Sequence, residues 1–122
     1  MRAICYHNPR CGKSRQTLQL LQEQGIDVDI IDYLKTPPTF QQLDDIIQKL
    51  GIEPRDLMRT KEAAYKTNGL DDKSLDRQAL INGMINNPIL IERPIVIVNG
   101  KAVIGRPPEA VLAILKSYLL VL

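Results

Sequence analysis

The stretch His7-Asn8-Pro9-Arg10-Cys11-Gly12-Lys13-Ser14 decides the fold that we expect for this chain of 122 residues. It follows a short apolar run, residues 3–6, which is typical of a buried strand, and its Asn-Pro turn leads into a helix that begins at Gly12. Cys11 therefore lies at the first turn of that helix, where unpaired backbone N–H groups and the helix dipole favour a thiolate. Because the thiolate is the reactive form of cysteine, the stretch predicts a reactive thiol with a lowered pKa.

The residues that follow predict a strand–helix–strand unit. The helix carries Leu18 and Leu21 inward and ends near Gly25, and residues 26–34 are expected to form a second strand. Two strands joined by so short a helical connection are expected to be parallel, with a right-handed crossover. Ligands of parallel sheets bind at the carboxyl ends of the strands, and Cys11 is expected there.

The middle of the chain, residues 39–90, predicts a helical insertion. Its first helix has apolar residues spaced three and four apart and ends at Gly51. A short second helix begins near Pro54, which suits a first helical position, and extends to Arg59. A third helix begins at Ser74 and ends ahead of an Asn-Asn-Pro sequence.

The last part of the chain predicts two strands and a helix. Residues 95–98 and 102–104 are β-branched runs joined by Asn99-Gly100, which is a strong signal for a tight hairpin. Pro107-Pro108-Glu109 opens a final helix. The order βαβ, helical insertion, ββα predicts an α/β protein with a thioredoxin-like fold, as a single domain over residues 1–122.

Composition excludes several classes of protein. Hydrophobic residues at 44%, charged residues at 25% and a net charge of +2 are typical of globular proteins. The sequence has no basic run interleaved with aromatic residues that would indicate nucleic-acid binding. The longest apolar run is broken by Lys116 and Ser117 and is too short to span a membrane. Two cysteines and the lack of a signal-like start predict a cytoplasmic location.

The two cysteines have different surroundings. Cys5 lies between apolar neighbours in the first strand, which predicts a core residue. Cys11 lies in a polar loop with Arg10, Lys13 and Arg15 nearby, which predicts a reactive nucleophile. A buried, inert thiol is the alternative for Cys11, and its polar flanks argue against it.

Two residues of the opening stretch can support the thiol. Ser14 replaces the second cysteine of a dithiol motif, so an oxidised Cys11 must be resolved by an external thiol or, as the weaker alternative, by Cys5. The Ser14 hydroxyl either hydrogen-bonds the thiolate or satisfies backbone groups at the helix start. His7, the only histidine, is either a positive or hydrogen-bonding neighbour of the thiolate or a loop cap, and we favour the former. One histidine and two cysteines make a poor metal site, and we expect no metal.

Three arginines are candidate ligands of an anion. Arg93 precedes the third strand and Arg106 follows the fourth, so both can face the thiol. Together with Arg59 they offer planar guanidinium groups that suit a tetrahedral oxyanion. The alternative is that they are solvated surface residues, as most arginines are.

Five sequence blocks together resemble the glutaredoxin-coupled arsenate reductase family, the ArsC type. They follow one another nearly from end to end of the chain. The blocks are Tyr6-His7-Asn8-Pro9-Arg10-Cys11, Tyr33-Leu34 with Pro37-Pro38, Leu57-Met58-Arg59, Asn87-Pro88-Ile89-Leu90-Ile91-Glu92-Arg93-Pro94-Ile95, and Gly105-Arg106-Pro107-Pro108-Glu109. The resemblance implies a thioredoxin-like fold with a helical insertion and a cis peptide bond before Pro94.

The resemblance also implies the chemistry. Cys11 would attack arsenate, the arginines Arg59, Arg93 and Arg106 would bind the oxyanion, and His7 would help to keep the thiol ionised. Glutathione, as co-substrate, would attack the adduct and release arsenite, and glutaredoxin, as partner, would clear the mixed disulfide. No bound cofactor is implied.

Two other functions fit the same residues. The related Spx-type transcriptional regulators share the fold and bind RNA polymerase, and a regulatory or partner-binding protein without oxyanion turnover is the alternative hypothesis. Many of those regulators carry Cys-x-x-Cys, so Ser14 argues against a disulfide switch. Glutathione transfer or mixed-disulfide exchange on proteins is a third possibility, because both need only one thiol.

Overall fold

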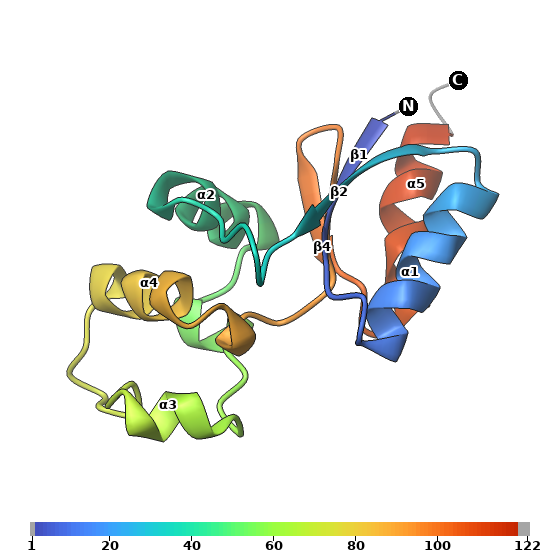
Figure 1. Ribbon diagram of the computed structural model, residues 1–122. Helices are drawn as coiled ribbons and strands as arrows, with labels where there is room; N and C mark the ends of the chain where they lie inside the picture. Colours follow the sequence, from blue (N-terminus) through green and yellow to red (C-terminus); the bar gives the residue numbers. More distant parts are fainter. Residues whose placement is uncertain (1, 120–122) are drawn as a thin grey trace. The chain divides into compact units, whose positions relative to one another are not determined.

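The computed structural model describes the backbone of residues 2–119 and the side chains as far as residue 115. The chain divides into two compact units (Figure 1). Unit 1 combines Met1–Thr36 with Arg93–Leu122, and unit 2 is Pro37–Glu92.

Unit 1 is built on a four-stranded sheet with the strand order β2-β1-β3-β4. The strands are β1 (Arg2–His7), β2 (Asp27–Asp32), β3 (Ile95–Val98) and β4 (Lys101–Ile104). β1 runs parallel to β2, and β3 runs antiparallel to both β1 and β4. The predicted parallel βαβ unit is therefore confirmed, and the late hairpin completes the same sheet.

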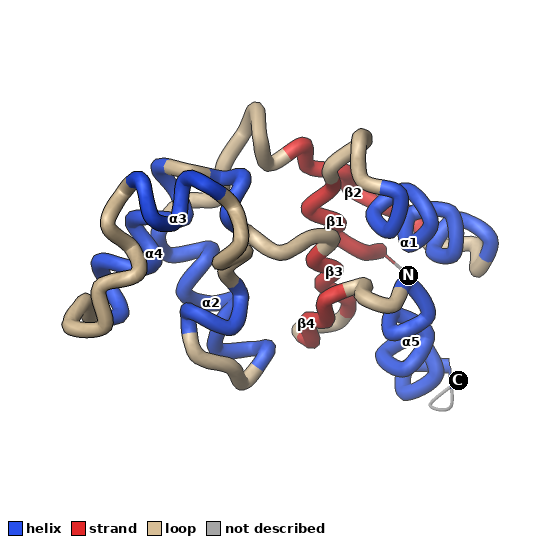
Figure 2. The backbone as a smooth tube through the Cα atoms, turned by 90° about the horizontal axis from the view of Figure 1, so that it is seen from below, coloured by secondary structure: helices blue, strands red, loops and turns tan. Residues whose placement is uncertain are grey.

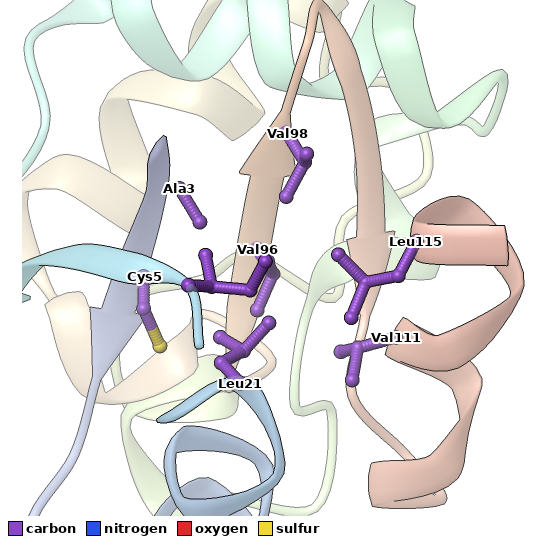
Figure 3. Close-up of a cluster of buried hydrophobic side chains, with 8 residues drawn as sticks. Ala3, Cys5, Leu21, Val96, Val98, Val111 and Leu115 are labelled. Carbon is purple, nitrogen blue, oxygen red and sulfur yellow. The ribbon is translucent and has the colours of Figure 1, made fainter. Parts of the chain in front are cut away.

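Two helices, α1 (Gly12–Glu23) and α5 (Val111–Leu119), cover one face of this sheet (Figures 1 and 2). Successive strand residues point to opposite faces, so alternate residues meet these helices. The side chains that form this core are Ala3, Cys5, Leu21, Ile26, Val96, Val98, Val111 and Leu115, most of which Figure 3 labels. Burying one aliphatic side chain of this kind contributes about 1.5–3 kcal/mol. Cys5 is fully buried, which confirms it as a core residue.

The turns of unit 1 follow from local sequence. Asn99 and Gly100 have φ angles of 52° and 77°, the left-handed conformation that a two-residue hairpin loop requires, and the predicted hairpin is confirmed. The second strand is shorter than predicted. It ends at Asp32, because the backbone N–H groups of Lys35 and Thr36 donate to the Asp32 carbonyl and turn the chain.

Two proline peptide bonds of unit 1 are cis. The bond Arg93–Pro94 is cis, as predicted, and the bond Arg106–Pro107 is also cis, which was not predicted. Residues after the second bond form a short 3-10 helix, η3 (Pro108–Ala110), which leads into α5.

Unit 2 contains the predicted helical insertion. The helix α2 (Phe40–Leu50) begins at a capping box formed by Thr39 and Gln42 and ends at Gly51, where φ is 66°. The helix α4 (Arg77–Asn86) begins later than the predicted Ser74, because the Asp76 side chain accepts a hydrogen bond from Ala79 and caps it there.

The segment between these two helices differs from the prediction. The helix predicted from Pro54 to Arg59 is a 3-10 helix, η1 (Pro54–Leu57), and it ends because Met58 forms a β-bridge with Ile91. The short helices α3 (Ala63–Thr67) and η2 (Pro88–Leu90) were not predicted. Within the described backbone, no helix is both long and apolar enough to cross a membrane.

Candidate active site

Cys11 is the N-cap residue of α1, in an extended backbone conformation. Its own N–H donates to the carbonyl of Asn8 at 3.0 Å, and its carbonyl accepts from Arg15 at 3.0 Å. The backbone N–H groups of Lys13 and Ser14, in the first turn of the helix, face the sulfur. The predicted place of Cys11 at a helix start is therefore confirmed, and the helix dipole favours negative charge there.

Two arginines of the predicted set lie at this sulfur. Arg106 Nη1 donates to Cys11 Sγ at 3.8 Å, and the Arg93 guanidinium also interacts with the sulfur. Partial burial of the sulfur raises its pKa, but the N–H of Ser14, the guanidinium of Arg93 and the N–H of Lys13 together outweigh burial, so the pKa of Cys11 lies below its usual range. The thiolate is thus favoured within unit 1.

The Arg93 guanidinium is not fully hydrogen-bonded in the part of the chain that the structure describes. Its Nε and Nη1 atoms are buried, and within the described part of the chain neither has a hydrogen-bond partner. A buried charged donor without an acceptor is costly, and such groups usually serve a ligand or a reaction. Oxyanions are suitable acceptors, because guanidinium N–H groups match their geometry.

The loop of Arg106 is held against the loop of Pro94. Gly105 donates from its backbone to the Pro94 carbonyl at 2.9 Å, and Arg106 Nη1 donates to the Arg93 carbonyl at 3.3 Å. The Thr17 hydroxyl of α1 lies 3.3 Å from the Gly105 carbonyl. A Cβ atom at Gly105 would lie 2.5 Å from Thr17 Oγ1, so only glycine allows this approach.

Ser14 does not offer its hydroxyl to the sulfur. Ser14 Oγ lies 2.6 Å from His7 Nδ1 and accepts a hydrogen bond from the Asn8 backbone at 3.0 Å. Of the two interpretations left open by the sequence, the structure favours satisfaction of loop groups, while the backbone N–H of Ser14 serves the thiolate.

His7 is only 7% exposed and bonds to Ser14 rather than to the sulfur. Burial lowers its pKa, the Asp32 carboxylate raises it and Arg15 lowers it, and the pKa of His7 ends below its usual value. A neutral imidazole is therefore favoured near pH 7, and the positive role considered for His7 is not supported.

Arg59 belongs to unit 2. There its Nε donates to Glu62 at 3.3 Å and its Nη1 lies 3.8 Å from Glu92, while its backbone N–H donates to Leu90. These ion pairs fix the guanidinium within unit 2, and its role as an oxyanion ligand stays a prediction.

Sequence reasoning overlooked Asn8 and Thr17. Asn8 is buried, its side-chain oxygen accepts from the Arg10 backbone at 3.0 Å, and its carbonyl accepts from Cys11. The Asn-Pro dipeptide was a signal, because asparagine readily stabilises such turns. The Thr17 hydroxyl donates to the Lys13 carbonyl one helical turn earlier at 2.8 Å, but no local pattern marks its contact with Gly105, which lies 88 residues later.

The arrangement suits attack by a thiolate on an anion. The lowered pKa of Cys11 favours the anionic form of its sulfur. The neighbouring guanidinium groups offset the repulsion between two negative reactants. No group of three or more metal-ligating side chains occurs among the residues whose placement is described.

Comparisons with known proteins identify relatives of this chain. The ArsC family model matches residues 6–114. The chain is 54% identical over 110 residues to the uncharacterized protein YfgD of Escherichia coli (strain K12), covering 89% of this chain and 92% of that protein. It is 50% identical over 111 residues to the arsenate reductase of Neisseria meningitidis serogroup A, covering 90% and 95%.

The fold agrees as well. The structure of the arsenate reductase from Vibrio cholerae matches with a TM-score of 0.90 at 50% identity, over 93% of this chain and 97% of that one. The predicted thioredoxin-like α/β fold is confirmed, and the chain belongs to the ArsC family.

Proposed function

We propose that this protein reduces arsenate to arsenite with thiols as the reductant. The observation that carries the proposal is the Cys11 sulfur, whose pKa is lowered and which Arg106 Nη1 approaches to 3.8 Å. The arsenate reductases among its relatives support the choice of oxyanion. Cys11 is the nucleophile, and Arg93, Arg106 and Arg59 are the oxyanion ligands.

The first step forms a bond between sulfur and pentavalent arsenic. The Cys11 thiolate attacks arsenic, and one hydroxyl group of the hydrogen arsenate ion takes up a proton from the solvent and leaves as water. The arsenic stays pentavalent in this adduct. Guanidinium groups favour the step because they stabilise charge on the oxyanion while the anionic sulfur approaches. The unpartnered Nε and Nη1 of Arg93 supply such donors.

The second step moves the electrons. The sulfur of glutathione attacks Cys11 Sγ, the sulfur–arsenic bond breaks, and its electron pair leaves with arsenic as arsenite. A disulfide between Cys11 and glutathione remains, so two thiols have been oxidised and one arsenic reduced by two electrons. Cys5 is not needed, because it is fully buried and burial raises its pKa to about 12.

The third step restores the thiol. A glutaredoxin thiolate attacks the glutathione sulfur of the mixed disulfide and releases the Cys11 thiolate. Ser14 makes an external thiol necessary, because no second cysteine follows Cys11 in the motif. The cycle consumes reduced glutathione, and we place it in the cytoplasm, where thiols are kept reduced.

An arsenite-formation assay with arsenate, glutathione and glutaredoxin tests the proposal. We expect wild-type turnover and a loss of about 1,000-fold or more in Cys11→Ser, because a hydroxyl is a far weaker nucleophile at neutral pH. Cys5→Ala is the matched control and should retain turnover. Activity in Cys11→Ser would refute the nucleophile, and an inactive wild-type protein would refute arsenate as substrate.

A further inference from the structure

A hollow of about 420 Å³ in unit 1 lies beside the loop that ends at Cys11. It is lined by Asn8, Pro9 and Arg10 of that loop and by Asp32, Leu34 and Lys35, at and after the end of β2. His7 and Asp32 are register partners at the carboxyl ends of the parallel strands β1 and β2. The pairing of these strands therefore brings the two sides of the hollow, residues 8–10 and residues 32–35, together. No step of the proposed cycle uses this hollow.

The charges around the hollow are one carboxylate and two cations. No ion pair joins Arg10, Asp32 or Lys35 to another residue in the described part of unit 1, whereas Arg2 and Asp29, on the same two strands, are paired. Leu34 adds an apolar side chain that is 38% exposed. The hollow thus combines an apolar surface with two cations and one anion that form no ion pair with the described residues of unit 1.

We propose that this hollow binds the thiol co-substrate of the reaction, glutathione, through charge complementarity. The inference rests on the proposed function for the identity of that thiol. Glutathione carries two carboxylates and one ammonium group, which match Arg10, Lys35 and Asp32 in number and sign. Hydrogen bonds between oppositely charged groups are shorter and stronger than those between neutral groups.

The position of the hollow suits the second step of the cycle. Arg10 lines the hollow and is adjacent to Cys11 in the chain, so the hollow borders the loop that carries the sulfur. An extended tripeptide spans about 10 Å, and its cysteine is the central residue. Anchoring both ends of the tripeptide therefore holds its thiol in the region of the Cys11 loop.

Thiol–disulfide exchange tests this binding site without arsenate. The Cys11 thiolate attacks one sulfur of glutathione disulfide, a new disulfide joins Cys11 to glutathione, and the other glutathione leaves as a thiolate. Bis(2-hydroxyethyl) disulfide reacts in the same way but is uncharged. The ratio of the two second-order rate constants cancels any change in the reactivity of Cys11 itself.

We expect the double variant Arg10→Gln, Lys35→Gln to lower this ratio about tenfold or more, equivalent to about 1.4 kcal/mol. Lys101→Gln, which removes one positive charge away from the hollow, is the control for position and should leave the ratio within about twofold. Lys101 pairs with Val98, which pairs with Ala3, so it lies at the opposite end of the sheet from His7 and Asp32. A ratio that is unchanged in the double variant overturns the proposal.

Asp32→Asn separates a fitted site from a general attraction of anions. Loss of the carboxylate should slow the reaction with glutathione disulfide about fivefold, because the ammonium group loses its partner. The reaction with 3,3′-dithiodipropionate, which has carboxylates but no ammonium group, should not slow. A faster reaction with both disulfides is the result of a general positive field and would overturn the proposal.

Arsenite formation measured in parallel keeps the two proposals apart. A wild-type protein with the charge-dependent ratio but without arsenite formation refutes the arsenate function and supports the binding site. Arsenite formation with a ratio that the double variant leaves unchanged refutes the binding site alone.

Discussion

The Cys11 sulfur lies where backbone N–H groups of α1 and the guanidinium groups of Arg93 and Arg106 converge. Each of these groups interacts more favourably with a thiolate than with a thiol. Burial acts in the opposite direction, so the lowered pKa depends on the donors around the sulfur. Removing one donor should therefore be visible in the titration of this single residue.

Arg93→Gln should move the alkylation of Cys11 to higher pH. Iodoacetamide reacts with the thiolate, and the guanidinium lowers the pKa of Cys11, so its loss raises that pKa and slows alkylation at pH 7. The readout is the alkylation rate from pH 5 to 10, where Cys5 stays silent because it is buried. The same variant should lose about 100-fold in kcat/KM for arsenate.

The control for this variant is Lys101→Gln, which removes one positive charge at the other end of the sheet. It should leave the pH dependence of Cys11 alkylation and the kcat/KM for arsenate at their wild-type values. An alkylation curve in Arg93→Gln that coincides with the wild-type curve would show that Arg93 does not stabilise the thiolate.

The sequence predicted the place of Cys11 and the approach of Arg93 and Arg106, because these depend on a helix start and on strand ends. The role of Cys11 as nucleophile stays a prediction. The sequence left two roles open for the Ser14 hydroxyl: a hydrogen bond to the thiolate, or satisfaction of backbone groups at the helix start. The partners observed, His7 and Asn8, depend on how the loop closes over the helix. The neutral state favoured for His7 follows from its burial, which is a tertiary property that local sequence does not encode.

At the scale of elements, the site depends on one close approach between α1 and the segment after β4. Thr17 of α1 meets Gly105, and Gly105 in turn meets the Pro94 loop. This approach sets the position of Arg106, the next residue, relative to Cys11. Gly105 is thus a positioning residue.

Gly105→Ala should disturb both stability and the position of Arg106. The new Cβ would lie 2.5 Å from Thr17 Oγ1 and 2.8 Å from Pro94 Cγ. Overpacking of this kind costs about 1–3 kcal/mol, which urea unfolding measures. Displacement of Arg106 should raise KM for arsenate more than it lowers the alkylation rate of Cys11.

Two further variants check this interpretation. Gly12→Ala, whose Cβ would meet only Arg15 Nη2 at 3.8 Å, should unfold at nearly the wild-type urea concentration. Adding Thr17→Ala to Gly105→Ala should lower KM for arsenate part of the way back to the wild-type value, because it removes the closest clash. A Gly105→Ala protein with wild-type stability and KM would contradict the positioning role.

Elements with local signals were predicted and those set by distant partners were not. Asn99-Gly100 encodes its own turn, and the hairpin followed from it. The helix predicted to reach Arg59 ended early because Met58 bridges to Ile91, a contact that no local pattern shows. Asp76 was a readable cap, and it would have placed the start of α4 correctly.

For the whole molecule, the order of strands and helices predicted the architecture. Unit 2, Pro37–Glu92, begins and ends within two residues of the predicted insertion at 39–90. The single-domain organisation stays a prediction. Arg59 is different, because its place in the sequence did not link it to a strand end near the thiol, and the ion pairs of its side chain lie within unit 2.

The rate at which a reagent labels the Cys5 thiol should measure how readily the sheet of unit 1 opens. In a Cys11→Ser background Cys5 is the only thiol, and it is fully buried, so it reacts only when the sheet opens. Leu21→Ala removes a core partner and should cost about 2–5 kcal/mol. Labelling of Cys5 should therefore accelerate about 30-fold or more.

Ile30→Ala is the matched control for this experiment. Ile30 pairs with Cys5 on the neighbouring strand but is 49% exposed, so its truncation should cost less than about 1 kcal/mol. Equal acceleration by both variants would show that Cys5 labelling does not depend on the core of unit 1.

The insertion of unit 2 into unit 1 has a consequence for biosynthesis. A ribosome delivers β1, α1 and β2 first, yet one edge of β1 has no partner until β3 emerges, after all of unit 2. Unit 2 is continuous in sequence, and domains generally fold as units during translation. We expect the nascent chain to complete unit 2 while β1 still exposes an unpaired edge, and this is the interval in which a chaperone would protect it.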